Sequence, residues 1–162
     1  MAALGDVYRA SGRDDEAQRQ YDLVAAIDSL YRANGIDTGL EMALFLSDHR
    51  SAEGGIDEAI ARARAVYQAR PGSIRAADAL SWALYKAGSY DEALVYSKEA
   101  VRLGTQDAML LFHAGMISYR AGDQEAARDF LARALEVNPS FSVLYAEEAA
   151  TMLHGLRSAL RG

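Results

Sequence analysis

The chain has 162 residues, a formal net charge of −6, a 51% hydrophobic composition and no cysteine. An acidic chain without a basic stripe is a poor candidate for nucleic-acid binding, and the lack of cysteine excludes disulfides and thiolate chemistry. The first residues do not resemble a signal peptide, and no run of about 18 apolar residues could span a membrane. We therefore expect neither nucleic acid nor membrane insertion; the compartment stays undetermined, with the cytoplasm favoured.

The first segment, residues 1–39, is predicted to be a truncated helix pair. The stretch AALGDVYRA matches only the later part of a first helix, and Gly12 marks the turn to a second one. From Gly12 to Gly54 is 42 residues (54 − 12), whereas later intervals are 34. The simplest interpretation adds about two turns to the second helix, with Gly35 closing it. The uncovered end of this unit could also mediate self-association.

Three full units follow, at residues 40–73, 74–107 and 108–141. Their turn glycines, Gly54, Gly88 and Gly122, are 34 residues apart, and an alanine comes five residues after each: Ala59, Ala93 and Ala127. Such a period is typical of helix-turn-helix arrays, whose units bury their apolar faces only against each other.

Further positions recur in the same frame for physical reasons. Small residues occupy the predicted closest approach of the two helices in each unit: Gly5, Ser47, Ser81 and Gly115. The residues before them are apolar: Leu4, Leu46, Leu80 and Ala114. Two capping boxes are predicted at helix starts, Thr38 with Glu41 and Ser89 with Glu92.

The tail, residues 142–162, begins like a fifth unit but lacks a turn glycine followed by a second helix. Its apolar residues suggest one amphipathic helix that closes the array: Leu144, Met152, Leu153, Leu156 and Leu160. Terminal repeats are expected to be atypical, because one of their faces meets water.

These features together resemble the tetratricopeptide repeat (TPR) family over nearly the whole chain. The resemblance implies an all-α fold, a right-handed alpha-alpha superhelix, as a single array over residues 1–162. It also implies that the first helices of the units line a concave groove. The stripe expected to face that groove for partner binding is Arg75, Asp78, Trp82, Tyr85, Lys86, Met109, Phe112, His113, Met116, Tyr119 and Arg120. Aromatic and methionine side chains flanked by cations make suitable binding anchors.

An alternative interpretation is that several of these aromatic residues pack against the extended helix or the C-terminal cap. The two-carboxylate clamp of TPR proteins that bind chaperone C-termini is not matched, since its positions carry Leu44, Asp48, Ala79 and Trp82. A chaperone co-factor role is therefore not expected. The acidic balance also disfavours the RNA-reading pentatricopeptide type of array.

No catalytic chemistry is predicted. The histidines His49, His113 and His154 are not spaced with one another or with carboxylates as metal ligands would be, so no metal and no cofactor is expected. We expect His113 to make a polar groove contact, and His49 to cap a helix end.

The predicted function is a non-catalytic scaffold that binds an extended or helical segment of a protein or peptide partner. The alternative is a structural, regulatory or self-association module of a larger polypeptide, possibly an enzyme.

Overall fold

The computed structural model describes residues 2–50 and 54–159, which form nine α-helices and no strand. Leu160, which was expected in the closing helix, lies outside this range. The helices are α1 (Ala2–Ala10), α2 (Asp14–Ala33), α3 (Gly39–His49), α4 (Gly55–Ala69), α5 (Ile74–Lys86), α6 (Tyr90–Val101), α7 (Ala108–Arg120), α8 (Gln124–Val137) and α9 (Ala146–Ala159). The all-α prediction is confirmed.

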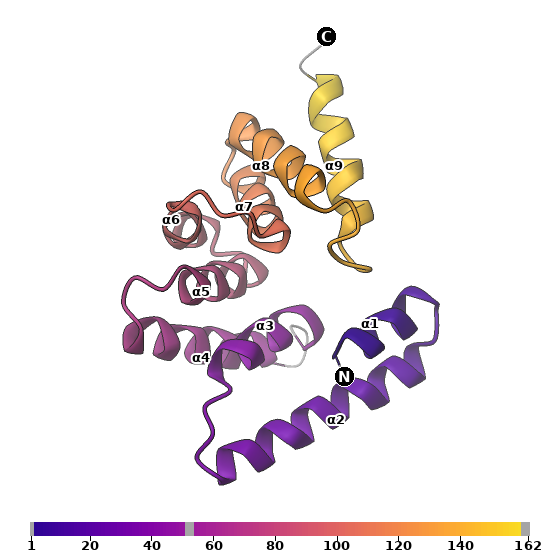
Figure 1. Cartoon of the computed structure of the whole chain (residues 1–162), viewed down its shortest axis with the longest axis vertical. Coiled ribbons are helices and arrows are strands. Elements are labelled where there is room, and N and C mark those ends of the chain that lie inside the picture. Colours follow the sequence, from indigo (N-terminus) through magenta and orange to yellow (C-terminus); the bar gives the residue numbers. More distant parts are fainter. Residues whose placement is uncertain (1, 51–53, 160–162) are drawn as a thin grey trace.

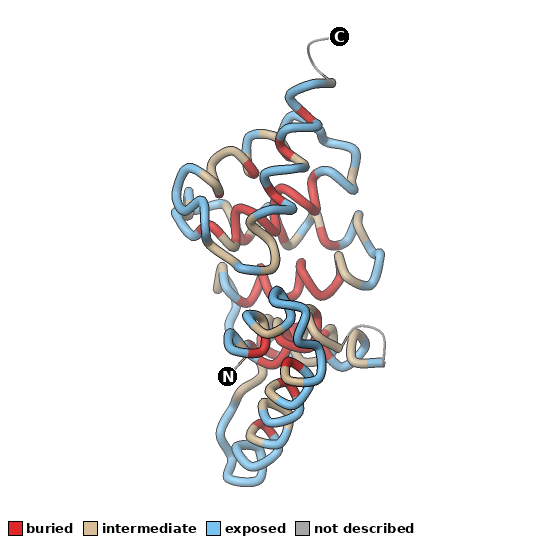
Figure 2. Tube along the Cα trace, turned by 90° about the vertical axis from the view of Figure 1, so that its right-hand side faces the viewer, coloured by how far each residue is buried: buried red, intermediate tan, exposed pale blue. Residues whose placement is uncertain are grey.

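The helices pack as consecutive pairs, α1 with α2, α3 with α4, α5 with α6 and α7 with α8, and α9 packs on α8. The pairs are stacked along the long axis of the molecule (Figure 1). Each pair covers the next, so the buried residues follow the middle of the stack, whereas the far end of α2 is exposed (Figure 2). The fold is a helical-repeat solenoid, as the period predicts.

The turns and helix starts follow from local chemistry. Gly88 and Gly122 have φ of 81° and 88°, which a side chain would strain, and each precedes the second helix of its pair. Helix α7 starts with the Asp107 carboxylate accepting from two backbone N–H groups. The predicted capping boxes are not formed: neither Thr38 nor Ser89 makes a side-chain cap.

Small residues let the paired helices approach closely. Ser47, Ser81 and Ala127 are fully buried, and a Cβ on Gly115 would lie 2.7 Å from Leu131 Cγ on the partner helix. Leu4, the apolar residue before Gly5, is 45% exposed, because no other helix pair covers that side of α1 within the described residues. The residues at the same position of the later units, Leu46, Leu80 and Ala114, are buried.

Helix α2 departs from the other second helices. It is 20 residues long, against 15 for α4 and 12 for α6. After it, Gly35 adopts φ 73° and the chain returns through Ile36 and Asp37 to the start of α3. The far end of α2 therefore extends beyond the stack (Figure 1).

Candidate functional site

The predicted groove residues fall into an accessible and a buried group. Arg75, Tyr119 and Arg120 are exposed, and Tyr85, Lys86 and Met109 are partly exposed. Buried residues are Asp78, Trp82, Phe112, His113 and Met116, each at 4% exposure or less. The expectation that the buried group offers free anchoring surface is therefore corrected: for these side chains, the alternative of core packing describes the structure.

Two of these buried side chains, Phe112 and Trp82, are covered by Tyr145, which the repeat pattern does not single out. Its ring stacks on Phe112 with centroids 5.1 Å apart and meets Trp82 edge-on at 5.9 Å. Phe141 adds a second ring against Phe112, at 5.4 Å. Phe141 and Tyr145 follow Pro139 and are four positions apart. This pair of aromatic residues was the signal in the sequence that could have indicated the contact. The segment that leads into α9 thus covers the predicted aromatic stripe.

Tyr145 also closes a polar cluster that joins three segments of the chain. Its hydroxyl donates to Asp48 Oδ1 at 2.7 Å, and Trp82 Nε1 donates to the same oxygen at 2.8 Å. Lys86 Nζ donates to the Tyr145 hydroxyl at 3.2 Å and lies 4.7 Å from the centroid of the Trp82 ring. One carboxylate therefore holds residues from α5 and from the segment before α9 against α3.

Burial shifts the pKa values of this cluster. It lowers the pKa of the Lys86 ammonium, a shift that the nearby Asp48 and Glu148 carboxylates oppose. Burial also raises the pKa of the Tyr145 hydroxyl, and the Asp48 carboxylate adds to that rise. Tyr145 therefore stays a neutral hydrogen-bond donor over the physiological range.

A buried histidine extends the cluster along α7. His113 stacks on Trp82 with ring centroids 4.0 Å apart, and its Nδ1 lies 2.9 Å from Asp78 Oδ1. The imidazole therefore donates from Nδ1 to the carboxylate, while its Nε2 is buried and has no hydrogen-bond partner among the described residues. The polar contact predicted for His113 is internal rather than exposed in a groove.

One recess adjoins this cluster on α3, α5 and α7, and a second lies beside α9. The smaller, of about 160 Å³, is lined by Leu44, Asp48, Arg75, Asp78, Asp107, Met109, Leu110 and His113. The larger, of about 640 Å³, lies beside α9 and is lined by Tyr119, Gln124, Leu144, Glu147, Glu148, Thr151, Met152, Gly155 and Leu156. Of the accessible residues of the predicted stripe, Arg75 and Met109 thus border the smaller recess and Tyr119 borders the larger one.

The remaining histidines differ from each other. The prediction that His49 caps a helix end is wrong: its ring stacks on Tyr21 at 4.2 Å, its Nε2 lies 3.4 Å from Asp6 Oδ1, and its Nδ1 has no hydrogen-bond partner among the described residues. His154 is exposed on α9. Within residues 2–50 and 54–159, no group of three or more His, Cys, Asp or Glu side chains could hold a metal ion. No helix of the same ranges combines the length and apolar character needed to cross a membrane.

Comparison with known proteins supports the repeat assignment. Two tetratricopeptide-repeat family models match residues 73–106 and 110–141. Among solved structures, the first TPR of Spaghetti (RPAP3) bound to an HSP90 peptide is 21% identical, with a TM-score of 0.59, covering 75% of this chain and 95% of that one.

Other solved structures show the same fold at a similar sequence identity. The translocator chaperone SycD of Yersinia enterocolitica is 20% identical, with a TM-score of 0.60 over 76% of this chain and 86% of that one. MamA is 20% identical, with a TM-score of 0.52 over 96% and 89%. A comparison with curated protein sequences found no match. The 34-residue period, the fold and the two family-model matches agree, and they assign residues 73–106 and 110–141 to the tetratricopeptide repeat family.

Proposed function

We propose that this protein is a non-catalytic scaffold whose concave face, formed by the first helices of the pairs, binds an extended or helical segment of a partner protein. The supporting observation is that accessible residues of the predicted stripe line open recesses: Arg75 and Met109 line the one beside Asp48, and Tyr119 lines the one beside α9. Tyr145 itself indicates the chemistry that this face accepts, namely an aromatic ring on Phe112 and a donor to Asp48. The solved relatives bound to peptides or partner segments are consistent with such a role.

Selection of a displayed peptide library, followed by titration of Trp82 fluorescence, tests the proposal. Phe112 is fully buried, so its replacement would damage the core; the informative variants are at exposed Arg75 and Tyr119. Saturable binding that weakens in Arg75→Ala or Tyr119→Ala supports binding on the concave face. Binding that both variants leave unchanged would place the partner elsewhere.

The second candidate function, self-association, is favoured by a specific observation. Leu4 and Val7 on α1 are 45% and 47% exposed, and they form an apolar surface at the end of the stack. Molar mass measured by light scattering over a range of concentrations tests this function. Growth in mass that disappears in Leu4→Ser/Val7→Ser supports it, and a constant monomer mass contradicts it.

A further inference from the structure

The larger recess, of about 640 Å³, has an apolar interior to which three parts of the chain contribute. Tyr119 comes from the end of α7, Leu144 from the segment before α9, and Met152 from α9 itself. Tyr119 is 37% exposed, and Leu144 and Met152 are partly exposed, so solvent reaches these side chains. We call this recess the α9 recess. Its walls can take up an apolar side chain of another molecule.

Gly155 leaves one part of the recess without a side chain. A Cβ added there would meet no heavy atom within 4 Å. Glu148, Met152 and Gly155 are four and three positions apart, so they lie on one face of α9. Ala149 and Leu153 hold the neighbouring face of the helix in the core, at 0% and 5% exposure. The open face is therefore held in position by the packing of its own helix.

The charged groups of the α9 recess are carboxylates without ion-pair partners. Glu147 and Glu148 are exposed, and no Lys, Arg or His belongs to the described residues that line the recess. The positive end of the helix dipole favours acids in the first turn of α9. Neither carboxylate, however, accepts a hydrogen bond or forms an ion pair with any residue of 2–50 and 54–159. The recess thus combines an apolar interior with a negative rim.

The cations that act near Glu148 belong to other contacts. Burial lowers the pKa of Lys86, and Asp48 and Glu148 oppose this shift, but the ion pair of Lys86 is with Asp48, at 3.9 Å. The Arg120 guanidinium lies over the Tyr90 ring, 4.3 Å from its centroid. Neither cation lines the α9 recess. A cation from outside would therefore meet carboxylates that no lining residue neutralises.

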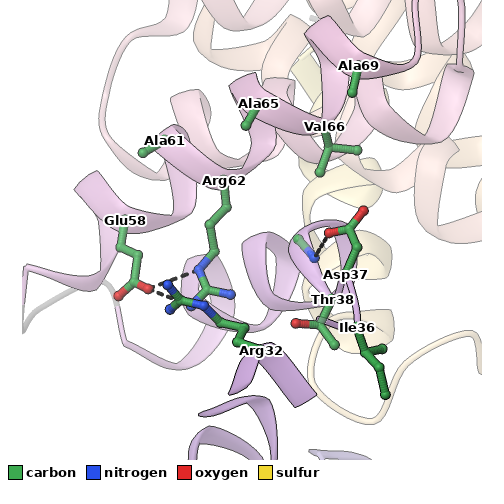
Figure 3. Close-up of a pocket in the computed structure, with 11 residues that line it drawn as sticks. Arg32, Ile36, Asp37, Thr38, Glu58, Ala61, Arg62, Ala65, Val66 and Ala69 are labelled. Carbon is green, nitrogen blue, oxygen red and sulfur yellow. Dashed lines mark hydrogen bonds and ion pairs between the residues drawn. The ribbon is translucent and has the colours of Figure 1, made fainter. Parts of the chain in front are cut away.

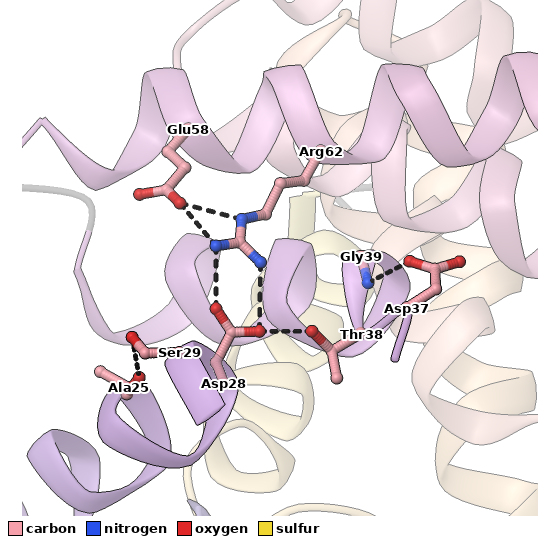
Figure 4. Close-up of polar contacts among 8 residues, drawn as sticks. All are labelled: Ala25, Asp28, Ser29, Asp37, Thr38, Gly39, Glu58 and Arg62. Atoms are coloured by element: carbon pink, nitrogen blue, oxygen red, sulfur yellow. Dashed lines mark hydrogen bonds and ion pairs between the residues drawn. The ribbon is translucent and has the colours of Figure 1, made fainter. Parts of the chain in front are cut away.

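The recess between α2 and α4 shows the opposite arrangement. It has a volume of about 550 Å³, and Arg32, Glu58 and Arg62 are among its lining residues (Figure 3). The Arg62 guanidinium donates to both carboxylate oxygens of Asp28, at 3.2 and 2.9 Å, and to Glu58 at 2.9 and 2.7 Å (Figure 4). Arg32 acts electrostatically on the same Asp28 carboxylate. The charges there neutralise one another, so that recess does not indicate the charge of a partner.

From these observations we propose that the α9 recess binds a basic segment of a partner protein. An apolar side chain of the segment enters beside Gly155, and a neighbouring lysine or arginine meets Glu147 or Glu148. Lysine and arginine combine an apolar stem with a charged head, which matches apolar walls below an acidic rim. The net charge of −6 also attracts a basic partner. This inference rests on the proposed scaffold function and adds the chemistry of the partner.

Two parallel selections from a displayed peptide library test the inference, one on the wild-type protein alone and one with depletion on Gly155→Trp. The added side chain starts in open space, so the indole fills the recess and leaves the core intact. Ala150→Trp, at an exposed alanine of the same helix, is the matched control. Thermal unfolding verifies that both variants are folded. We expect the depleted selection to enrich peptides with a lysine or arginine beside an apolar residue.

Fluorescence anisotropy of a labelled, enriched peptide then measures each contact. We expect Gly155→Trp to weaken binding about tenfold or more, because the burial of one apolar side chain is lost. Glu147→Gln/Glu148→Gln should weaken it about fivefold, as for two exposed ion pairs, and added salt should weaken it further. Glu147→Lys/Glu148→Lys should instead bind a peptide whose basic residues are replaced by glutamate. Ala150→Trp and Glu136→Gln, which removes an exposed acid of α8 outside the recess, should bind like the wild type.

Three outcomes would overturn the inference: a depleted selection that enriches nothing, enrichment of acidic or uncharged peptides, and binding that survives Gly155→Trp. The selection on the wild type alone separates this failure from failure of the scaffold function. Peptides from it that bind Gly155→Trp normally and Arg75→Ala weakly would keep the scaffold function and place its site outside the α9 recess. A wild-type selection that enriches no peptide would contradict both.

Discussion

Replacing Gly115 by alanine should destabilise the protein, although alanine favours helices. The new Cβ would lie 2.7 and 2.9 Å from the Cγ and Cδ2 atoms of Leu131 and 3.3 Å from its backbone nitrogen. Leu131 is fully buried, so it has no space to yield. Overpacking costs about 1–3 kcal/mol, and replacing a helical glycine returns about 0.5–1 kcal/mol. Taking the middle of each range, the net loss is about 1.2 kcal/mol, or roughly 2–5 °C in Tm for a chain of this size.

Gly155→Ala provides the matched control. Gly155 also lies within a helix, but a Cβ added there would meet no heavy atom within 4 Å. The same substitution should therefore stabilise the chain by about 0.5–1 kcal/mol. Urea unfolding followed by circular dichroism measures both variants. A Gly115→Ala protein as stable as the wild type, or shifts of the same sign in both variants, would refute the close crossing of α7 and α8.

Asp28→Asn should lower the free energy of unfolding by about 1–3 kcal/mol, because it leaves the Arg62 guanidinium without its buried counter-charge; urea unfolding checks this. Burial lowers the pKa of His49, and the nearby Asp6 carboxylate opposes that shift. The unfolded chain therefore takes up a proton below about pH 6.5 that the folded state resists, so stability should fall as the pH drops from about 7 to 5. His49→Gln should flatten this slope. Tyr145→Phe should cost about 1–2 kcal/mol, since it removes the hydrogen bond to Asp48 while keeping the ring; an unchanged urea midpoint would contradict the role of this bond.

The candidate site was predictable only in part. The 34-residue frame correctly identifies which helices carry the stripe, and the exposed Arg75 and Tyr119 remain candidates for partner contact. It could not show that Tyr145 covers Phe112: the two residues are 33 positions apart (145 − 112), close to one repeat, but Tyr145 lies in the turn before α9 and not within a first helix. The hydrogen bond between Tyr145 and Asp48 spans 97 residues and has no local signature.

The all-helical repeat fold is determined by the sequence alone, because its signals are local: apolar periodicity, glycines at turns and small residues at helix crossings repeat within each unit. Gly115 and the buried Ala127 follow from that frame. Only the tertiary structure decides how the ends depart from it. The contact of Tyr145 with the aromatic stripe depends on the turn before α9, and the clamp between Asp28 and Arg62 beside α4 depends on the additional turns of α2. Their geometry depends on how whole helices pack, and no local pattern encodes that packing.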